Sequence, residues 1–191
     1  MGHRSRTILL AAAAALLAPA ALVGPARGAA RAAACPGADA APTAATAAQV
    51  RRATLCLLNA ERARRGLAPL APRRPLATAA RRHARAMVAG RFFDHTSPGG
   101  STMESRVRRC GYLRGASGWS LGEDIAWGAG GRATPRAIVA AWMRSPPHRA
   151  NILNPRFRDA GIGVAAGGPV RLPPGAAAGT YVADFGRRAG G

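Results

Sequence analysis

Two long stretches of the chain carry apolar residues at the three-to-four-residue spacing of an amphipathic helix. In the first, Ala47–Arg65, Gly66 follows the last turn, as glycine commonly does at the end of a helix. In the second, Pro75 suits a first helical position and Gly90 ends the pattern. One helical face of each stretch is mainly apolar: Val50, Thr54, Leu57 and Leu58 in the first, and Leu76, Ala79, Ala80, His83 and Met87 in the second.

Capping signals and short apolar runs predict the remaining elements. Ser101-Thr-Met-Glu104 is a capping box for a short helix that runs to about Cys110. Thr134 and Pro135 supply a cap and a first residue for a helix to Arg144. Extended segments are expected at Ser120–Trp127, Ile162–Ala165 and Thr180–Phe185. Helices precede most strands without regular alternation, so we expect an α+β fold with an antiparallel sheet and helices packed against it.

The N-terminal residues have the pattern of a secretory signal peptide. A short basic head is followed by an uncharged apolar run, Ile8–Val23, and then by small residues. That run is shorter than the ~20 residues of a membrane span. We therefore expect a signal peptide over residues 1–30 with cleavage between 28 and 34, a flexible tail over 31–46 and one domain over 47–188. The expected product is an extracellular monomer with no membrane span.

All 28 basic residues are arginines, and the formal net charge is +20. The abundance of Ala, Gly, Pro and Arg is typical of a GC-rich coding sequence, which weakens the charge as a functional signal. A basic surface favours anionic cell-envelope polymers, lipid head groups or nucleic acid as partners. Because the arginines are scattered and aromatic residues make up only 5% of the chain, the sequence does not indicate dedicated nucleic-acid binding.

Three cysteines are present: Cys35, Cys56 and Cys110. An odd number leaves one free thiol, one intermolecular bridge or no bridge. We favour a Cys35–Cys56 disulfide that ties the tail to the first helix, with Cys110 as a small apolar residue near a helix end. No CxxC spacing indicates a metal site built from cysteines.

Histidines and acids are scarce enough to be weighed one by one. Pro146 and Pro147 end the preceding helix, and the expected turn fixes His148, whose alternative role is that of a cation at a helix C-terminus. His83 lies in an apolar stripe, which is typical of a hydrogen-bonded core residue. Glu123 lies in an otherwise apolar segment, where it is either functional or paired with an arginine. No HExxH or GxSxG motif is present, and spacing alone does not bring these residues together.

The motifs taken in order resemble the CAP superfamily, also called the SCP domain, in its small bacterial secreted branch. The most specific pieces are HTSPGG from His95, GEDIA at Gly122–Ala126 and SPPHRANI from Ser145. Matching pieces cover residues 50–186. The resemblance implies a single α-β-α sandwich with a central, mostly antiparallel sheet and a central cavity.

The resemblance also implies a ligand cavity lined by His95, Glu123, Ser145 and His148. Ser145 stands where animal members have a second Glu, and Asp124 replaces the usual Asn of GEN. His95, Glu123 and His148 together offer two imidazoles and a carboxylate, which can hold Zn²⁺ or another divalent metal with a fourth position open. The alternative is a metal-free hydrogen-bonded cluster in which Glu123 orients one imidazole.

Three functions remain open from the sequence. The first is a secreted binding module whose His/Glu/His cavity takes a divalent metal or a small ligand, outside the cell or at the envelope. The second is a metal-assisted hydrolase of an envelope polymer, peptide or lipid, with the same three residues as catalytic candidates. The third is an arginine-driven binder of anionic envelope polymers.

Overall fold

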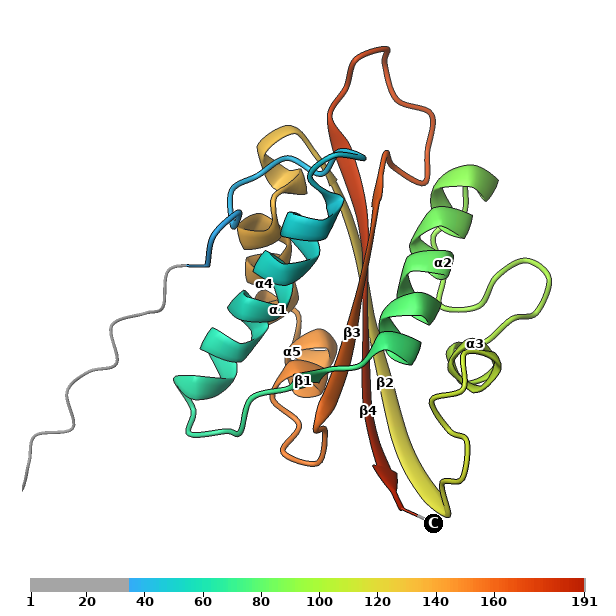
Figure 1. Cartoon of the computed structure of the whole chain (residues 1–191). Helices are drawn as coiled ribbons and strands as arrows, with labels where there is room; N and C mark the ends of the chain where they lie inside the picture. Colours follow the sequence, from blue (N-terminus) through green and yellow to red (C-terminus); the bar gives the residue numbers. More distant parts are fainter. Residues whose placement is uncertain (1–34, 191) are drawn as a thin grey trace, which may run out of the picture. The chain divides into compact units, whose positions relative to one another are not determined.

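The computed structural model describes residues 35–190, so the expected signal peptide and its cleavage site lie outside the described residues. A four-stranded sheet runs in the order β1-β3-β4-β2 between two layers of helices (Figure 1). β4 pairs antiparallel with both β2 and β3, and the short β1 pairs parallel with β3. The strands are β1 (Ala71–Pro72), β2 (Gly118–Ala129), β3 (Asp159–Ala166) and β4 (Ala178–Ala189). The predicted α+β sandwich is confirmed.

Helices α1, α4 and α5 cover one face of the sheet, and α2 and α3 lie on the other (Figure 1). A 3₁₀ turn, η1, precedes α4. The bounds are α1 (Ala47–Ala63), α2 (Arg74–Gly90), α3 (Met103–Arg109), η1 (Gly130–Ala133), α4 (Pro135–Arg144) and α5 (Pro146–Ile152). None of the helices within residues 35–190 is long and apolar enough to cross a membrane.

Alternating residues of β4 serve the two halves of the core. Tyr181 and Phe185 pack toward the layer of α1 and α4, where Trp142 is almost fully buried. Val182 packs with residues of α2 such as Met87. Because side chains alternate along a strand, Asp184 shares the α2 side with Val182. The strand thus carries a carboxyl group into the apolar interior.

Close packing of α2 on β3 depends on two glycines. A Cβ atom at Gly161 would lie 2.1 Å from the backbone nitrogen of Ala77, and one at Gly163 would lie 2.2 Å from the backbone of Ala80. Any side chain at these two positions would push the helix away from the sheet. The glycines therefore set the depth at which α2 holds His83.

One predicted turn and one predicted helix cap need correction. Pro146 and Pro147 do not form a turn: they open α5, because proline fits the first helical turn, where its missing N–H is not needed. The cap of α3 is Thr102, whose hydroxyl accepts from the backbone N–H of Ser105, rather than Ser101. The strand β1, within a predicted connector, was not predicted.

The predicted Cys35–Cys56 disulfide is confirmed, and Cys110 is a free cysteine at the end of α3. The described part of the expected tail, residues 35–46, forms turns. Asp39 accepts two hydrogen bonds from Arg136 of α4. The disulfide and this ion pair tie the segment to both α1 and α4.

Candidate functional site

Strand β2 presents its two adjacent acids to opposite sides of the sheet. Glu123 lies opposite Asp184 in the β2–β4 register, and its side chain faces α3, where Arg106 meets it. The next residue, Asp124, faces α5 and accepts a hydrogen bond from the amide of Asn151 at 2.7 Å. Both acids are buried. One short segment therefore carries a carboxyl group into each half of the interior.

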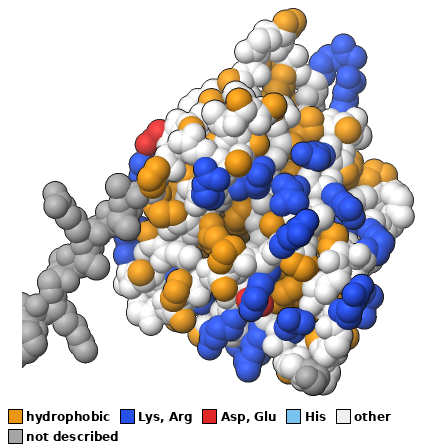
Figure 2. Space-filling model, in the orientation of Figure 1, with side chains coloured by type: hydrophobic (Ala, Val, Ile, Leu, Met, Phe, Trp, Pro, Cys, Tyr) orange, Lys and Arg blue, Asp and Glu red, His pale blue; other side chains and the backbone are white. Residues whose placement is uncertain are grey.

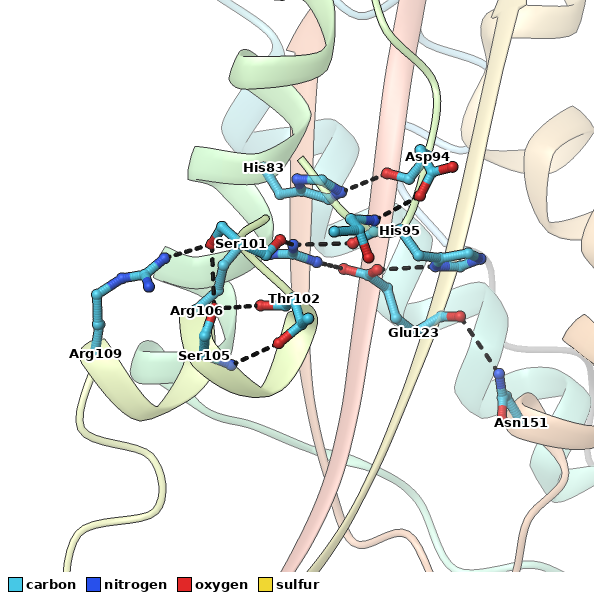
Figure 3. Close-up of polar contacts among 11 residues, drawn as sticks. His83, Asp94, His95, Ser101, Thr102, Ser105, Arg106, Arg109, Glu123 and Asn151 are labelled. Atoms are coloured by element: carbon cyan, nitrogen blue, oxygen red, sulfur yellow. Dashed lines mark hydrogen bonds and ion pairs between the residues drawn. The ribbon is translucent and has the colours of Figure 1, made fainter. Parts of the chain in front are cut away.

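Arg106 of α3 contacts several parts of the site (Figure 3). Its Nη2 donates to Oε2 of Glu123 at 2.5 Å, and both side chains are almost fully buried. Its Nη1 donates to the backbone carbonyls of His95 and Ser101 at 3.0 and 2.7 Å. The guanidinium thus neutralises the buried carboxylate and fixes both ends of the loop that carries His95.

His95 completes the pairing of Glu123. Its Nδ1 donates to Oε1 of Glu123 at 2.9 Å, while 55% of the imidazole side chain is exposed (Figure 3). This hydrogen bond and the negative charge of Glu123 raise the pKa of His95. Burial alone would raise the pKa of Glu123, but the bond from His95 and the charge of Arg106 bring it below its ordinary value. The buried carboxylate of Glu123 thus favours the protonated form of His95, while more than half of the imidazole side chain stays exposed.

The second site histidine comes from α5 on the other side of β2. His148 is half-buried, and burial together with the nearby charge of His95 lowers its pKa. It makes no hydrogen bond within residues 35–190. Asn151, one helical turn later, holds α5 against β2 through Asp124 and, at 3.5 Å, through the backbone carbonyl of Glu123. The pKa values of the two imidazoles are thus shifted in opposite directions, and the charge of His95 contributes to the shift of His148.

The fourth predicted residue, Ser145, lies between α4 and α5 as the N-cap of α5. Its hydroxyl makes no capping hydrogen bond, and none joins it to His148 among the described residues. The structure therefore does not show the Ser–His pair that a nucleophilic serine needs.

His83 fills the role predicted from its apolar surroundings. It is 1% exposed, and its Nε2 donates to the backbone carbonyl of Asp94 at 2.9 Å. Burial lowers its pKa, which favours the neutral ring that makes this bond. Asp94 in turn accepts from the backbone N–H of Thr96 (Figure 3). His83 is thus a core residue that holds the loop at Asp94, next to His95.

Three further residues contribute to the candidate site: Arg106, Asn151 and Asp184. Asp184 is fully buried, and burial together with the neighbouring charge of Glu123 raises its pKa well above the ordinary value, which favours the neutral carboxyl. Its position in a predicted buried strand was an available signal. Asn151, three residues after His148 in the same motif, was another. Nothing in the sequence distinguishes Arg106 from the other arginines.

The donor set does not fit the expected zinc site. Glu123 already uses one oxygen for His95 and the other for Arg106, whose positive charge opposes a cation beside it. Within residues 35–190 no group of three or more His, Cys, Asp or Glu side chains is arranged to hold a metal ion. The geometry corresponds to the alternative from the sequence, a hydrogen-bonded cluster in which Glu123 orients an imidazole.

A cavity of about 180 Å³ lies between α2 and α3, behind Arg106. Its lining includes His83, Arg82, Arg109 and Cys110, but not His95, Glu123 or His148. The exposed edge of His95 thus does not open into this cavity. The site is better described as the exposed imidazole of His95, held in place by the buried side chains of Glu123 and Arg106.

The Bacillus subtilis protein YkwD is 38% identical to this chain over 114 residues, which are 60% of this chain and 42% of YkwD. An extracellular protein containing an SCP domain from Bacillus anthracis superposes with a TM-score of 0.59 at 27% identity, over 75% of this chain and 43% of that structure. This chain therefore spans less than half the length of either relative.

An outer surface protein from Borrelia burgdorferi shares the fold, with a TM-score of 0.54 and 21% identity over 71% of this chain and 90% of its own. The family model described as CAP, the cysteine-rich secretory protein family, matches residues 55–182, a range that contains His95, Glu123 and His148. The chain belongs to the CAP, or cysteine-rich secretory protein, family, as its motifs and its sandwich of helices around one sheet indicate.

Proposed function

We propose that this chain is an extracellular binding module that holds a small anionic group between His95 and His148. The observation that carries the proposal is the ion pair of Glu123 and Arg106, which is buried and fixes the His95 imidazole with its Nε2 edge exposed. A preformed donor on a rigid support binds a ligand with little loss of conformational freedom. The extracellular relative from Bacillus anthracis supports the location.

The charges near the site favour an anion. Arg106 and Glu123 offset each other, and burial favours the neutral form of Asp184. Protonation of His95, which the nearby acids Asp94 and Asp124 also favour, therefore adds a positive charge at the surface. Imidazolium Nε2 donates a charge-assisted hydrogen bond to a carboxylate or phosphate oxygen. His148, whose lowered pKa favours the neutral ring, offers a second hydrogen bond without repelling His95. Carboxylate- or phosphate-bearing small molecules are therefore the proposed ligand class.

No contact among residues 35–190 favours the hydrolase alternative over a binding function. A hydrolase of the expected kind requires a metal-activated water or an activated serine. Neither the donors around Glu123 nor the hydroxyl of Ser145 is arranged for those roles.

The test is a titration of the chain with acetate and with inorganic phosphate, followed by the imidazole Hε1 resonances in NMR. Saturable shifts of His95 and His148 are expected, while His83, buried and bonded to Asp94, serves as an internal control. The variant Glu123→Gln should weaken binding at least tenfold. Unchanged resonances of both site histidines, or equal shifts at His83, would refute the proposal.

A further inference from the structure

A groove of about 440 Å³ runs between α1 and α2, over β1 and the outer edge of β3. Its floor is apolar and includes Leu55 and Ile162, while its rim consists of arginines. Figure 2 shows this face, where blue arginine side chains surround an orange apolar centre and acidic side chains are few. The rim residues are Arg51, Arg52, Arg73, Arg74 and Arg81.

Most of this positive charge is uncompensated. Among the described residues, only Arg73 of the five rim arginines pairs with an acid, Asp159. Partial burial and the neighbouring charges of Arg81, Arg85 and Arg52 lower the pKa of Arg51, which shows how closely the guanidinium groups lie. An anion in the groove would relieve this repulsion.

Arg73 also lines a second groove of about 650 Å³, at the end of the sheet where β3 begins and β4 ends. The other cationic side chains there are Arg114, Arg158, Arg187 and Arg188. The one acid in its lining is Asp159, which is buried and already bound by Arg73 and by the hydroxyl of Tyr112 at 2.8 Å. Through Arg73 the two grooves form one continuous path lined by arginines.

We propose that this path, which we call the arginine track, binds a linear polymer in which phosphodiesters alternate with short polyol units. Arginine recognises phosphate through paired hydrogen bonds, and a succession of arginines matches a succession of phosphates. The units between the phosphates must be short, because the guanidinium groups of Arg51, Arg52 and Arg81 lie close enough to affect one another. No aromatic residue lines either groove, so the stacking platform that single-stranded nucleic acids require is absent from this part of the described chain.

The arginine track shares no residue with the His95 site, so this inference goes beyond the proposed function and stands or fails separately. The probe is a synthetic poly(glycerol phosphate) chain, with affinity measured by calorimetry between 50 and 300 mM NaCl. The test variant is Arg51→Gln/Arg74→Gln/Arg81→Gln. The control, Arg132→Gln/Arg144→Gln/Arg171→Gln, removes the same charge at three arginines outside both grooves.

The test variant should bind the polymer at least tenfold more weakly than the wild type. The slope of log K against log salt concentration should also become shallower by about 2, since each lost phosphate contact contributes about 0.7. The control should stay within about threefold of the wild type. If the triple variant melts early, Arg74→Gln alone should still lower the slope by about 0.7. His95→Gln should leave polymer affinity unchanged.

Three results would refute the proposal that the arginine track binds this polymer. Equal weakening in the test and control variants would mean that only overall charge matters. A single-stranded DNA with the same number of phosphates, bound as tightly as the polymer, would point to nucleic acid instead. Absence of binding at 50 mM salt would remove the site altogether.

Discussion

Asp124 is a buried acid, and its ionisation should destabilise the folded state. Replacing it by Asn tests the electrostatics of the site. Burial raises the pKa of Asp124 to about 7, from an ordinary value of 3.8. Only one of its oxygens is hydrogen-bonded, by Asn151. Asparagine would keep that acceptor and the side-chain shape without ever acquiring a charge.

The direction of the pH dependence follows from whether the folded or the unfolded chain holds the proton of Asp124 more tightly. Between pH 4 and pH 7 the unfolded chain loses the proton of Asp124 before the folded chain does, so stability falls as pH rises through this range. A difference of about three pH units, at 1.36 kcal/mol each, sets a ceiling of about 4 kcal/mol. We therefore expect Asp124→Asn to unfold like the wild type at pH 4.5 and to be more stable by about 2–4 kcal/mol at pH 8.5.

Urea denaturation at pH 4.5, 6, 7 and 8.5 measures the free energy of unfolding of both proteins. The control variant is Glu104→Gln, which removes the same charge at an exposed position and should change stability by less than about 1 kcal/mol at every pH. A constant difference between Asp124→Asn and wild type across the four pH values would refute the reasoning. So would a variant that becomes less stable at pH 8.5.

Three further changes test other parts of the account. Replacing Cys35 and Cys56 by alanine should lower the free energy of unfolding by about 3 kcal/mol, because the bridge closes a loop across a sequence separation of 21; urea denaturation with and without reductant measures it. Arg106→Met should cost about 3–5 kcal/mol, since it leaves the carboxylate of Glu123 buried with its strongest partner gone; adding Glu123→Gln should restore part of that loss. Zinc titration by calorimetry should show no micromolar site that depends on the two site histidines; binding lost when both are replaced by alanine would contradict the ion-pair description.

Most of the fold could be predicted because local signals and tertiary structure agree. The periodicity of the long helices, the Thr134 cap and the apolar run at Thr180–Phe185 all matched the observed elements. Pro146 and Pro147 were misread because proline both ends one helix and begins another, and only packing against β2 decides which. The two-residue β1 depends on pairing with β3, a long-range contact with no local pattern.

The candidate site could be predicted only in part. His95, Glu123 and His148 followed from the family resemblance, and two of them, His95 and Glu123, are in direct contact. Arg106 could not be told apart from the other 27 arginines, because its burial against Glu123, and not its residue type, distinguishes it. Asp184 becomes part of the site through its register opposite Glu123, which no spacing in the sequence reveals.

The most direct test of the central claim is the NMR titration of the imidazole groups against pH, in the wild type and in Glu123→Gln. The account predicts that His95 titrates above 6.5 and His148 below it, because the first is bonded to Glu123 and the second is partly buried beside a cation. In Glu123→Gln the pKa of His95 should fall. Identical pKa values for His95 and His148, or a His95 pKa that does not respond to Glu123→Gln, would contradict the account.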